Sequence, residues 1–174
     1  MFRKIVLIGS VLFGLLAPAA ASEISTCFTP GEDCTQFVVD AIKLGKTEIL
    51  VQAYNYTSAP IITALGVARA EDKVDVRVIL DKSNEQERYR AATSNTASHG
   101  IPILIDDKPK IAHNKVIIID RQHVLTGSFN FTVNAQRSNA ENIILIKNDP
   151  ALAKRYVDNW QKRAGASRPM KPAP

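Results

Sequence analysis

Several polar side chains between residues 111 and 130 form a combination that suits phosphate chemistry. His113 and Lys115 lie two residues apart, directly before an apolar run of β-branched residues, 116–119. Residues two apart in an extended backbone point to the same face, so the imidazole and the ammonium group are expected side by side. The turn that follows adds a hydroxyl, from Ser128, and an amide, from Asn130. Together these groups can neutralise, orient and attack a phosphate.

Two short strands are expected to hold this cluster. The run 116–119 is apolar at every position, which predicts a strand buried on both faces. Residues 123–126 form a second strand that delivers the turn at Gly127, where a glycine permits a close backbone approach. Asp120 ends the first strand, and substrate contact and a purely structural role are both open for it. His123 falls in the spacer between the strands and is expected to be structural.

The rest of the chain alternates between strand and helix patterns. Strands are expected at 48–55, 74–80, 101–105 and 141–147. Helices are expected at 35–46, 58–70 and 85–98, and again after Pro150, where Leu152, Tyr156 and Trp160 share one face that suits core packing. This alternation predicts an α/β fold with a mixed β-sheet sandwiched between helices.

The two ends of the chain differ in composition from its middle. Residues 1–21 have Arg3 and Lys4 before a short apolar run and small residues, which predicts a signal peptide rather than a membrane anchor. We therefore expect an exported protein, periplasmic or secreted, with no stable membrane insertion after cleavage. Residues 22–163 form the folded domain, and 164–174, rich in Pro and basic residues, are expected to be a disordered tail.

Cys27 and Cys34 are the only cysteines of the 174-residue chain. In an oxidising compartment a disulfide is favoured over two free thiols, and it would fasten an N-terminal loop. A metal site would need more ligands nearby. Removing 1–21 takes two basic residues from 22 and leaves 17 acidic ones, so the net charge becomes 20 − 17 = +3. This mild excess is compatible with a polyanionic partner.

The spacing His113-x-Lys115, four residues, Asp120, six residues, Gly127-Ser128-x-Asn130 resembles the HKD motif of the phospholipase D superfamily. A short chain with one motif copy and an export signal is similar to the bacterial Nuc-type endonucleases of that superfamily. The resemblance implies a phospholipase D-like fold. It also implies catalytic roles for the motif residues, and substrate binding by Lys115, Ser128 and Asn130. An acidic residue downstream of the motif is implied to assist the histidine, and Glu141 is the candidate.

The resemblance further implies a mechanism shared between two copies of the chain. One histidine attacks phosphorus and a second protonates the leaving oxygen, and a single His-x-Lys supplies only one of them. A two-fold homodimer would complete the site. Lysines and asparagines would neutralise the phosphate, and no carboxylate cluster typical of a two-metal site stands near the motif. We therefore expect metal-independent catalysis with no cofactor.

The substrate class is less well defined than the chemistry. No base-reading motif is visible, so we expect non-specific endonuclease cleavage of DNA, with RNA as an open alternative. Basic residues expected to flank the cleft are Lys82, Arg88, Arg90, Lys108, Lys110 and Arg137. A secreted phospholipase D acting on lipid head groups is the alternative enzyme. A nucleic-acid-binding module with a decayed site is disfavoured, because the motif is intact.

Overall fold

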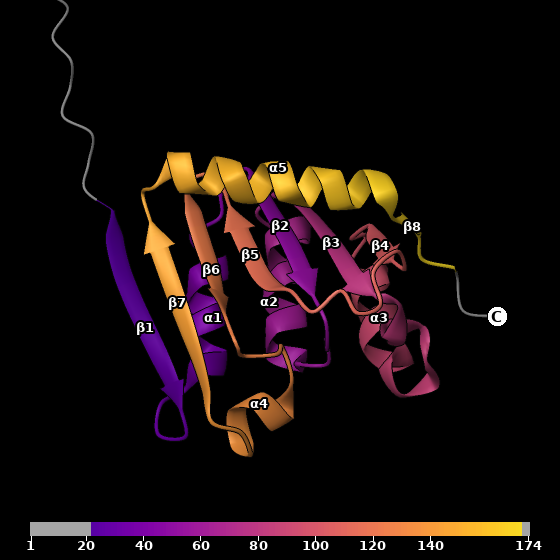
Figure 1. Cartoon of the computed structure of the whole chain (residues 1–174), viewed down its shortest axis with the longest axis horizontal. Helices are drawn as coiled ribbons and strands as arrows, with labels where there is room; N and C mark the ends of the chain where they lie inside the picture. Colours follow the sequence, from indigo (N-terminus) through magenta and orange to yellow (C-terminus); the bar gives the residue numbers. More distant parts are fainter. Residues whose placement is uncertain (1–21, 172–174) are drawn as a thin grey trace, which may run out of the picture.

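One mixed sheet of eight strands runs through the molecule in the order β1-β7-β6-β5-β2-β3-β4-β8 (Figure 1). The computed structural model describes residues 22–171; the expected signal peptide, 1–21, and residues 172–174 lie outside the described residues. Pairs β2·β3 and β3·β4 are parallel and the other five pairs are antiparallel. The strands are β1 (Glu23–Thr29), β2 (Glu48–Ala53), β3 (Asp75–Asp81), β4 (Ile103–Asp106), β5 (Lys115–Ile119), β6 (His123–Gly127), β7 (Glu141–Lys147) and β8 (Arg168–Pro169).

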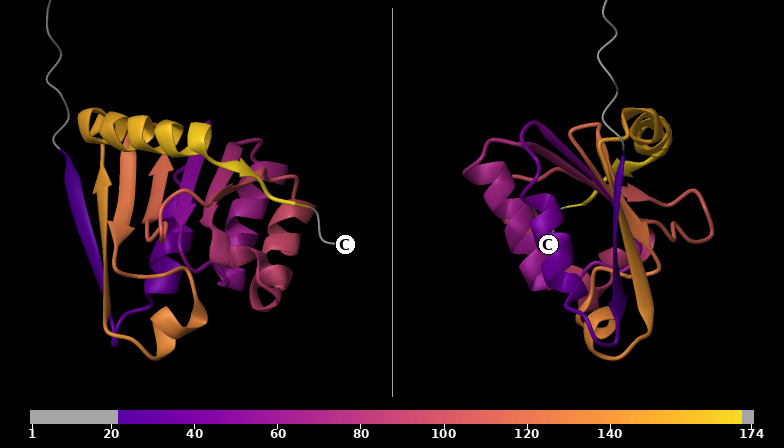
Figure 2. Two further views of the ribbon diagram at one scale, coloured as in Figure 1. Left: turned by 45° about the vertical axis from the view of Figure 1, so that its right-hand side comes forward. Right: turned by 90° about the vertical axis from the view of Figure 1, so that its left-hand side faces the viewer.

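Helices cover both faces of this sheet. Figure 2 shows α1, α2 and α3 on one side and the long α5 on the other. The α/β sandwich expected from the sequence is therefore confirmed. Within residues 22–171, no helix is both long and apolar enough to cross a bilayer. The helices are α1 (Cys34–Ile42), α2 (Ala59–Ala70), α3 (Arg90–Ser98), α4 (Val133–Arg137) and α5 (Pro150–Ala166), with 3-10 turns η1 (Lys82–Glu85) and η2 (Glu87–Tyr89).

The core lies in two layers, and β5 contributes to both. Ile117 and Ile119 pack in the layer beneath α1 and α2. Val116 and Ile118 pack with α5, where Trp160 is buried and its indole N–H donates to the carbonyl of Val51 at 3.1 Å. A strand buried on both faces has no polar side to expose, which explains the uninterrupted apolar run. Lys115, at the start of β5, therefore sits on a rigid strand.

The N-terminal segment is a strand rather than the expected loop. All seven residues of β1 pair antiparallel with β7, and Cys27 and Cys34 form a disulfide that joins β1 to the start of α1. Side chains on β1 alternate between exposed Phe28 and buried Cys27 and Thr29, as a strand with one covered face requires. The disulfide that the spacing predicted is present, and it links two elements of regular structure.

The C-terminal segment also differs from expectation, because the disordered tail predicted from residue 164 does not begin there. α5 continues to Ala166, and β8 pairs antiparallel with β4. The guanidinium of Arg168 bonds to the carboxylates of Glu85 and Asp107. These long-range ion pairs order a segment whose composition alone suggests disorder, since composition carries no information about distant partners.

Candidate active site

Two neighbouring strands fix the backbone that presents His113 and Lys115. The N–H of Ala112 donates to the buried carboxylate of Asp81, at the end of β3, over 2.7 Å. The N–H of Tyr54, just after β2, donates to the carbonyl of Asn114 over 2.9 Å. Both bonds lie at the end of the sheet where β5 begins. The sequence pattern predicts these two side chains on one face, and the two hydrogen bonds hold the backbone on which they stand.

The imidazole is exposed, whereas the ammonium group beside it is largely buried. Lys115 is 6% exposed, and its Nζ donates to the carbonyl of His113 at 2.9 Å. The ring of Tyr54 lies 4.7 Å from the ring of His113 and 5.3 Å from Nζ of Lys115, measured to ring centroids. The aromatic face thus attracts the cation and limits the motion of the imidazole. Sequence analysis did not single out Tyr54, since nothing in the motif points to it.

Burial lowers the pKa of Lys115, and the negative charge of Glu141 partly offsets this effect. A partly desolvated ammonium interacts strongly with an anion, because little water screens the pair. The lysine is therefore suited to neutralise a phosphate that approaches from the side of His113.

Glu141 lies at the start of β7 and is held by two side chains. Its carboxylate accepts from the hydroxyl of Ser128 at 2.5 Å and from the amide of Asn139 at 2.8 Å. Its own N–H donates to the buried hydroxyl of Thr29 at 3.0 Å. Within residues 22–171 no hydrogen bond joins Glu141 to His113. The expected assistance of the histidine by this carboxylate remains a prediction.

The turn after β6 brings Ser128 and Asn130 to the same end of the sheet. A Cβ on Gly127 would lie 2.1 Å from the carbonyl oxygen of Asn142, so only glycine fits this approach of β6 to β7. The Oδ1 atom of Asn130 is buried and has no hydrogen-bond partner within the described chain. A buried amide oxygen without a partner, on a motif residue, is a candidate contact for a ligand.

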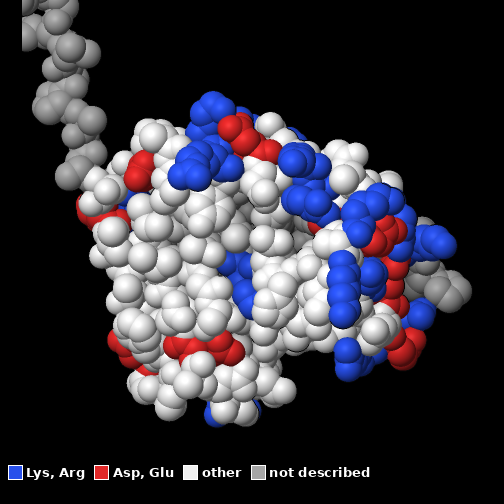
Figure 3. All heavy atoms as spheres, in the orientation of Figure 1, with Lys and Arg blue, Asp and Glu red and all other residues white. Residues whose placement is uncertain are grey.

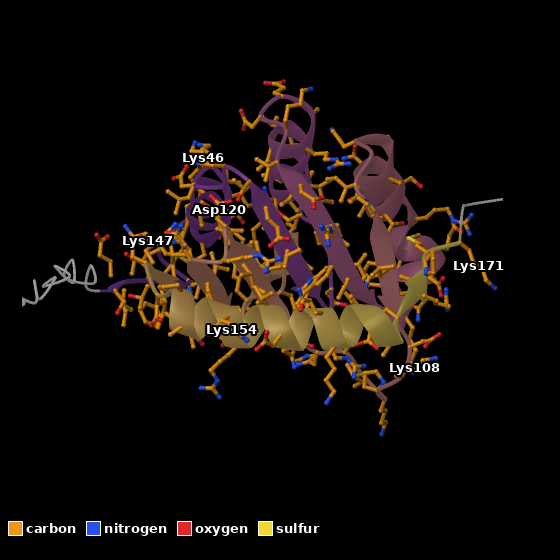
Figure 4. All side chains as sticks on the ribbon, turned by 90° about the horizontal axis from the view of Figure 1, so that it is seen from above. Lys46, Lys108, Asp120, Lys147, Lys154 and Lys171 are labelled. Carbon is orange, nitrogen blue, oxygen red and sulfur yellow. A yellow bond between two sulfur atoms is a disulfide. The ribbon has the colours of Figure 1, made fainter. Side chains whose placement is uncertain are left out.

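Asp120 does not join this cluster. It has φ +52° and follows the opposite end of β5. Its carboxylate accepts from the N–H groups of Lys46 at 2.8 Å, Thr47 at 2.8 Å and Glu48 at 3.0 Å, and from the Thr47 hydroxyl at 2.8 Å. Figure 4 labels Asp120 close to Lys46. These bonds favour the structural alternative for Asp120, and the structure places its carboxylate at the end of β5 opposite Lys115.

The remaining histidines lie away from His113. His123 begins β6, at the end opposite Ser128, and its Nδ1 accepts from the N–H of Asn148 at 3.0 Å. Burial lowers its pKa, which agrees with a structural role. The ring of His99 packs against Gly66 in α2 and is half-buried.

Charge is distributed unevenly over the surface. Figure 3 shows Lys and Arg gathered over α5 and over the side formed by α3 and β4, while the face over β1 and β7 carries few. Arg90 pairs with Glu87 and Lys108 with Asp107, which reduces their value for an outside anion. Lys110 and Arg137 are exposed, and neither takes part in an ion pair within residues 22–171.

Within residues 22–171, the one group of potential metal ligands is Cys27, Glu32 and Cys34. The two cysteines of this group are joined in the disulfide.

Comparisons with known proteins agree with this geometry. The family described as cardiolipin synthase, PLD-like domain, matches residues 38–163. A phospholipase D of Rickettsia prowazekii (strain Madrid E) is 44% identical over 152 residues, which cover 87% of this chain and 73% of the relative. A mitochondrial cardiolipin hydrolase of Xenopus laevis is 34% identical over 113 residues, 63% of this chain and 50% of that protein.

Solved structures extend the comparison to the fold. A phospholipase D family member, Nuc from Salmonella typhimurium, superposes with a TM-score of 0.83 at 35% identity and covers 87% of this chain and 100% of its own. NucT from Helicobacter pylori shares the fold, with a TM-score of 0.76 at 21% identity over 86% of this chain and 100% of its own. The chain therefore belongs to the phospholipase D superfamily, and it is a Nuc-type, phospholipase D-like phosphodiesterase.

Proposed function

We propose that the protein is an exported endonuclease that cleaves DNA, and RNA as a second substrate, through a phosphohistidine intermediate in an active site shared by a homodimer. The observation that carries this proposal is an exposed imidazole, His113, beside a buried cation, Lys115, at the open end of the sheet. The pair provides a nucleophile and a charge for the phosphate, but no second imidazole. The similarity to Nuc favours nucleic acid as the substrate.

The chemistry proceeds in two displacements at phosphorus. A ring nitrogen of His113 forms a bond to phosphorus while the P–O bond to the leaving group breaks, and the partner's His113 gives that oxygen its proton. The same partner imidazole then takes a proton from water, whose oxygen displaces the first histidine. Lys115 and Asn130 from each protomer stabilise the charge on the non-bridging oxygens. Each proton and bond is accounted for without a metal ion.

The metal-free step is tested with plasmid DNA in excess EDTA. We expect cleavage to continue, because the ammonium groups of Lys115 and its symmetry mate supply the positive charge. Activity that disappears in EDTA and returns with added Mg²⁺ would contradict this mechanism.

His113→Ala should abolish turnover but leave DNA binding in a gel-shift assay nearly intact, because binding depends mainly on many phosphate contacts.

Lipid head-group hydrolysis is the second candidate function, and the relatives favour it. The similar Rickettsia protein carries the name phospholipase D, and the Xenopus protein is a mitochondrial cardiolipin hydrolase. Parallel incubations with plasmid DNA and with vesicles of phosphatidylcholine or cardiolipin separate the two functions. If head groups or phosphatidate are released from vesicles while the plasmid stays intact, the protein is a phospholipase D and the endonuclease proposal is refuted.

The shared site is tested by mixing chains. Equal amounts of wild type and His113→Ala are unfolded and refolded with the disulfide intact, so that subunits pair at random. If one site needs both histidines, only wild-type pairs work, and about a quarter of the activity remains. If each chain held a whole site, about half would remain. A linear dependence on the wild-type fraction would show that the acid comes from the same chain.

Export is proposed from the leader and is supported by the disulfide. A bond between Cys27 and Cys34 persists in oxidising compartments and is rare in a reducing cytosol. N-terminal sequencing of the protein from the periplasm and the medium tests this step. A mature protein that begins near residue 22 is expected, and full-length protein retained in the cytoplasm would refute export.

A further inference from the structure

A polar cavity opens beside Asn130. Its volume is about 310 Å³. Its walls come from the loop after β2, from η2, and from the segment that joins β6 to β7 through α4. Among residues 22–171, no Lys, Arg, His, Asp or Glu lines it. The lining residues are Asn55, Thr57, Tyr89, Asn130, Thr132, Val133, Asn134 and Asn139.

Three of these residues connect the cavity to the catalytic cluster. Asn55 follows Tyr54, whose ring packs on His113. Asn139 donates its amide to the carboxylate of Glu141 at 2.8 Å. Asn130 is a motif residue, and its buried Oδ1 lacks a partner within the described chain. A ligand fragment in this cavity therefore lies next to the reacting phosphate and not at a separate site.

The lining selects a neutral group with both donors and acceptors. Four asparagine amides and two threonine hydroxyls line it. Asn55 Oδ1 already accepts from the Tyr89 hydroxyl at 2.7 Å, and the Asn139 amide donates to Glu141, but the remaining groups still offer both donors and acceptors. A second phosphate would lack a cation there. A quaternary ammonium head group would lack a carboxylate and an open aromatic face, since Tyr89 is 8% exposed and its ring faces the guanidinium of Arg88 at 4.9 Å.

We propose that this cavity binds the nucleobase adjacent to the scissile phosphate. The inference rests on the proposed endonuclease function and adds a substrate contact that the motif does not contain. An asparagine amide can present either its oxygen or its NH₂ group, so the lining can satisfy different base edges. The expected base preference is therefore weak. In the proposed dimer the cavity occurs twice, once on each side of a phosphate on the two-fold axis.

The test compares two substrates that share one leaving group. The p-nitrophenyl ester of thymidine 5′-phosphate carries a base, and bis(p-nitrophenyl) phosphate does not. Asn55→Ala and Asn134→Ala each remove one amide from the wall. Asn159→Ala, at an exposed position on α5, is the matched control. The full mature chain is used throughout, and circular dichroism confirms that each variant is folded.

We expect kcat/KM for the thymidine ester to fall about three- to tenfold in each cavity variant, as the loss of one hydrogen bond predicts. Hydrolysis of bis(p-nitrophenyl) phosphate and the activity of Asn159→Ala should not change. Equal losses on both substrates, or no loss on either, would overturn the base site and leave the nuclease proposal standing. Hydrolysis of vesicle lipids with no cleavage of plasmid or thymidine ester would instead overturn the nuclease proposal itself.

Discussion

Replacing Asp120 by Asn should destabilise the fold without impairing the chemistry. The carboxylate accepts four hydrogen bonds from the 46–48 segment, at 2.8 to 3.0 Å. An asparagine tolerates the left-handed backbone at φ +52°, so strain does not obscure the result. It keeps one oxygen for Thr47 and Glu48 but turns an NH₂ group toward the N–H of Lys46. Losing the charge and one acceptor should cost about 2 kcal/mol, since bonds to charged groups contribute about 1.5–3 kcal/mol and these are partly exposed.

That cost is measured by urea unfolding of the variant beside wild type. For a chain of this size, a loss of about 2 kcal/mol in the free energy of unfolding also lowers Tm by roughly 4–8 °C, which a thermal melt measures. Asp158→Asn, which removes one partner of an exposed ion pair with Lys154, is the matched control and should change stability by less than about 0.5 kcal/mol. At 25 °C the kcat/KM of folded Asp120→Asn should equal that of wild type. A large loss of kcat with unchanged stability would refute the structural assignment.

The pH dependence of the same variant provides a second readout. Burial alone would raise the pKa of Asp120, but the N–H groups of Glu48, Thr47 and Lys46 and the Thr47 hydroxyl outweigh it and lower the pKa. A lowered folded pKa stabilises the protein above the unfolded value of about 3.9, and this stabilisation is lost as pH falls through the folded pKa. The difference between wild type and variant should therefore be full at neutral pH and shrink in acid.

Three further predictions concern the active site and the disulfide. Glu141→Gln should keep the fold but lower kcat substantially. The reason is that the side chain bound by Ser128 and Asn139 loses its negative charge next to Lys115. Unchanged turnover would remove Glu141 from the site. Burial lowers the pKa of Lys115, so the loss of activity in alkaline solution should begin at a pH below about 10.4, the usual pKa of lysine. Lys115→Arg should abolish this alkaline loss, and a pH profile of kcat/KM measures both effects. Cys27→Ser with Cys34→Ser should cost about 2–3 kcal/mol in urea unfolding, from the entropy of the short loop that the disulfide closes, while the folded enzyme keeps its kcat.

The sequence was informative where the structure is local and periodic. The run 116–119 depends only on strand geometry, so this strand, buried on both faces, was predictable, whereas His113 precedes β5, which begins at Lys115. The disulfide followed from two cysteines and an export signal, and it is present. The order of strands in the sheet depends on pairings between distant segments, and no pattern within one strand encodes them.

Other features depend on partners that lie far away in the chain. Tyr54 joins the site because β2 and β5 are neighbours, not because of its own sequence context. Arg168 orders the end of the chain through Glu85 and Asp107, which are 83 and 61 residues away. Asp120 was expected at the end of the strand, but its bonds to the 46–48 backbone depend on the pairing of β2 with β5, which spacing does not reveal. In each case the missing information was a tertiary contact.

The geometry around His113 also supports the proposal that the active site is shared by two copies of the chain. A displacement at phosphorus needs an acid on the side opposite the nucleophile. His123 lies at the far end of β6 and His99 packs against α2, so neither can reach that position. Glu141 lies on the same side as Lys115 and is already held by Ser128 and Asn139. Within the described chain, His113 therefore has no imidazole to face. In the proposed dimer, a second copy of the chain would supply one, because a two-fold axis through the phosphate would turn each His113 toward the other.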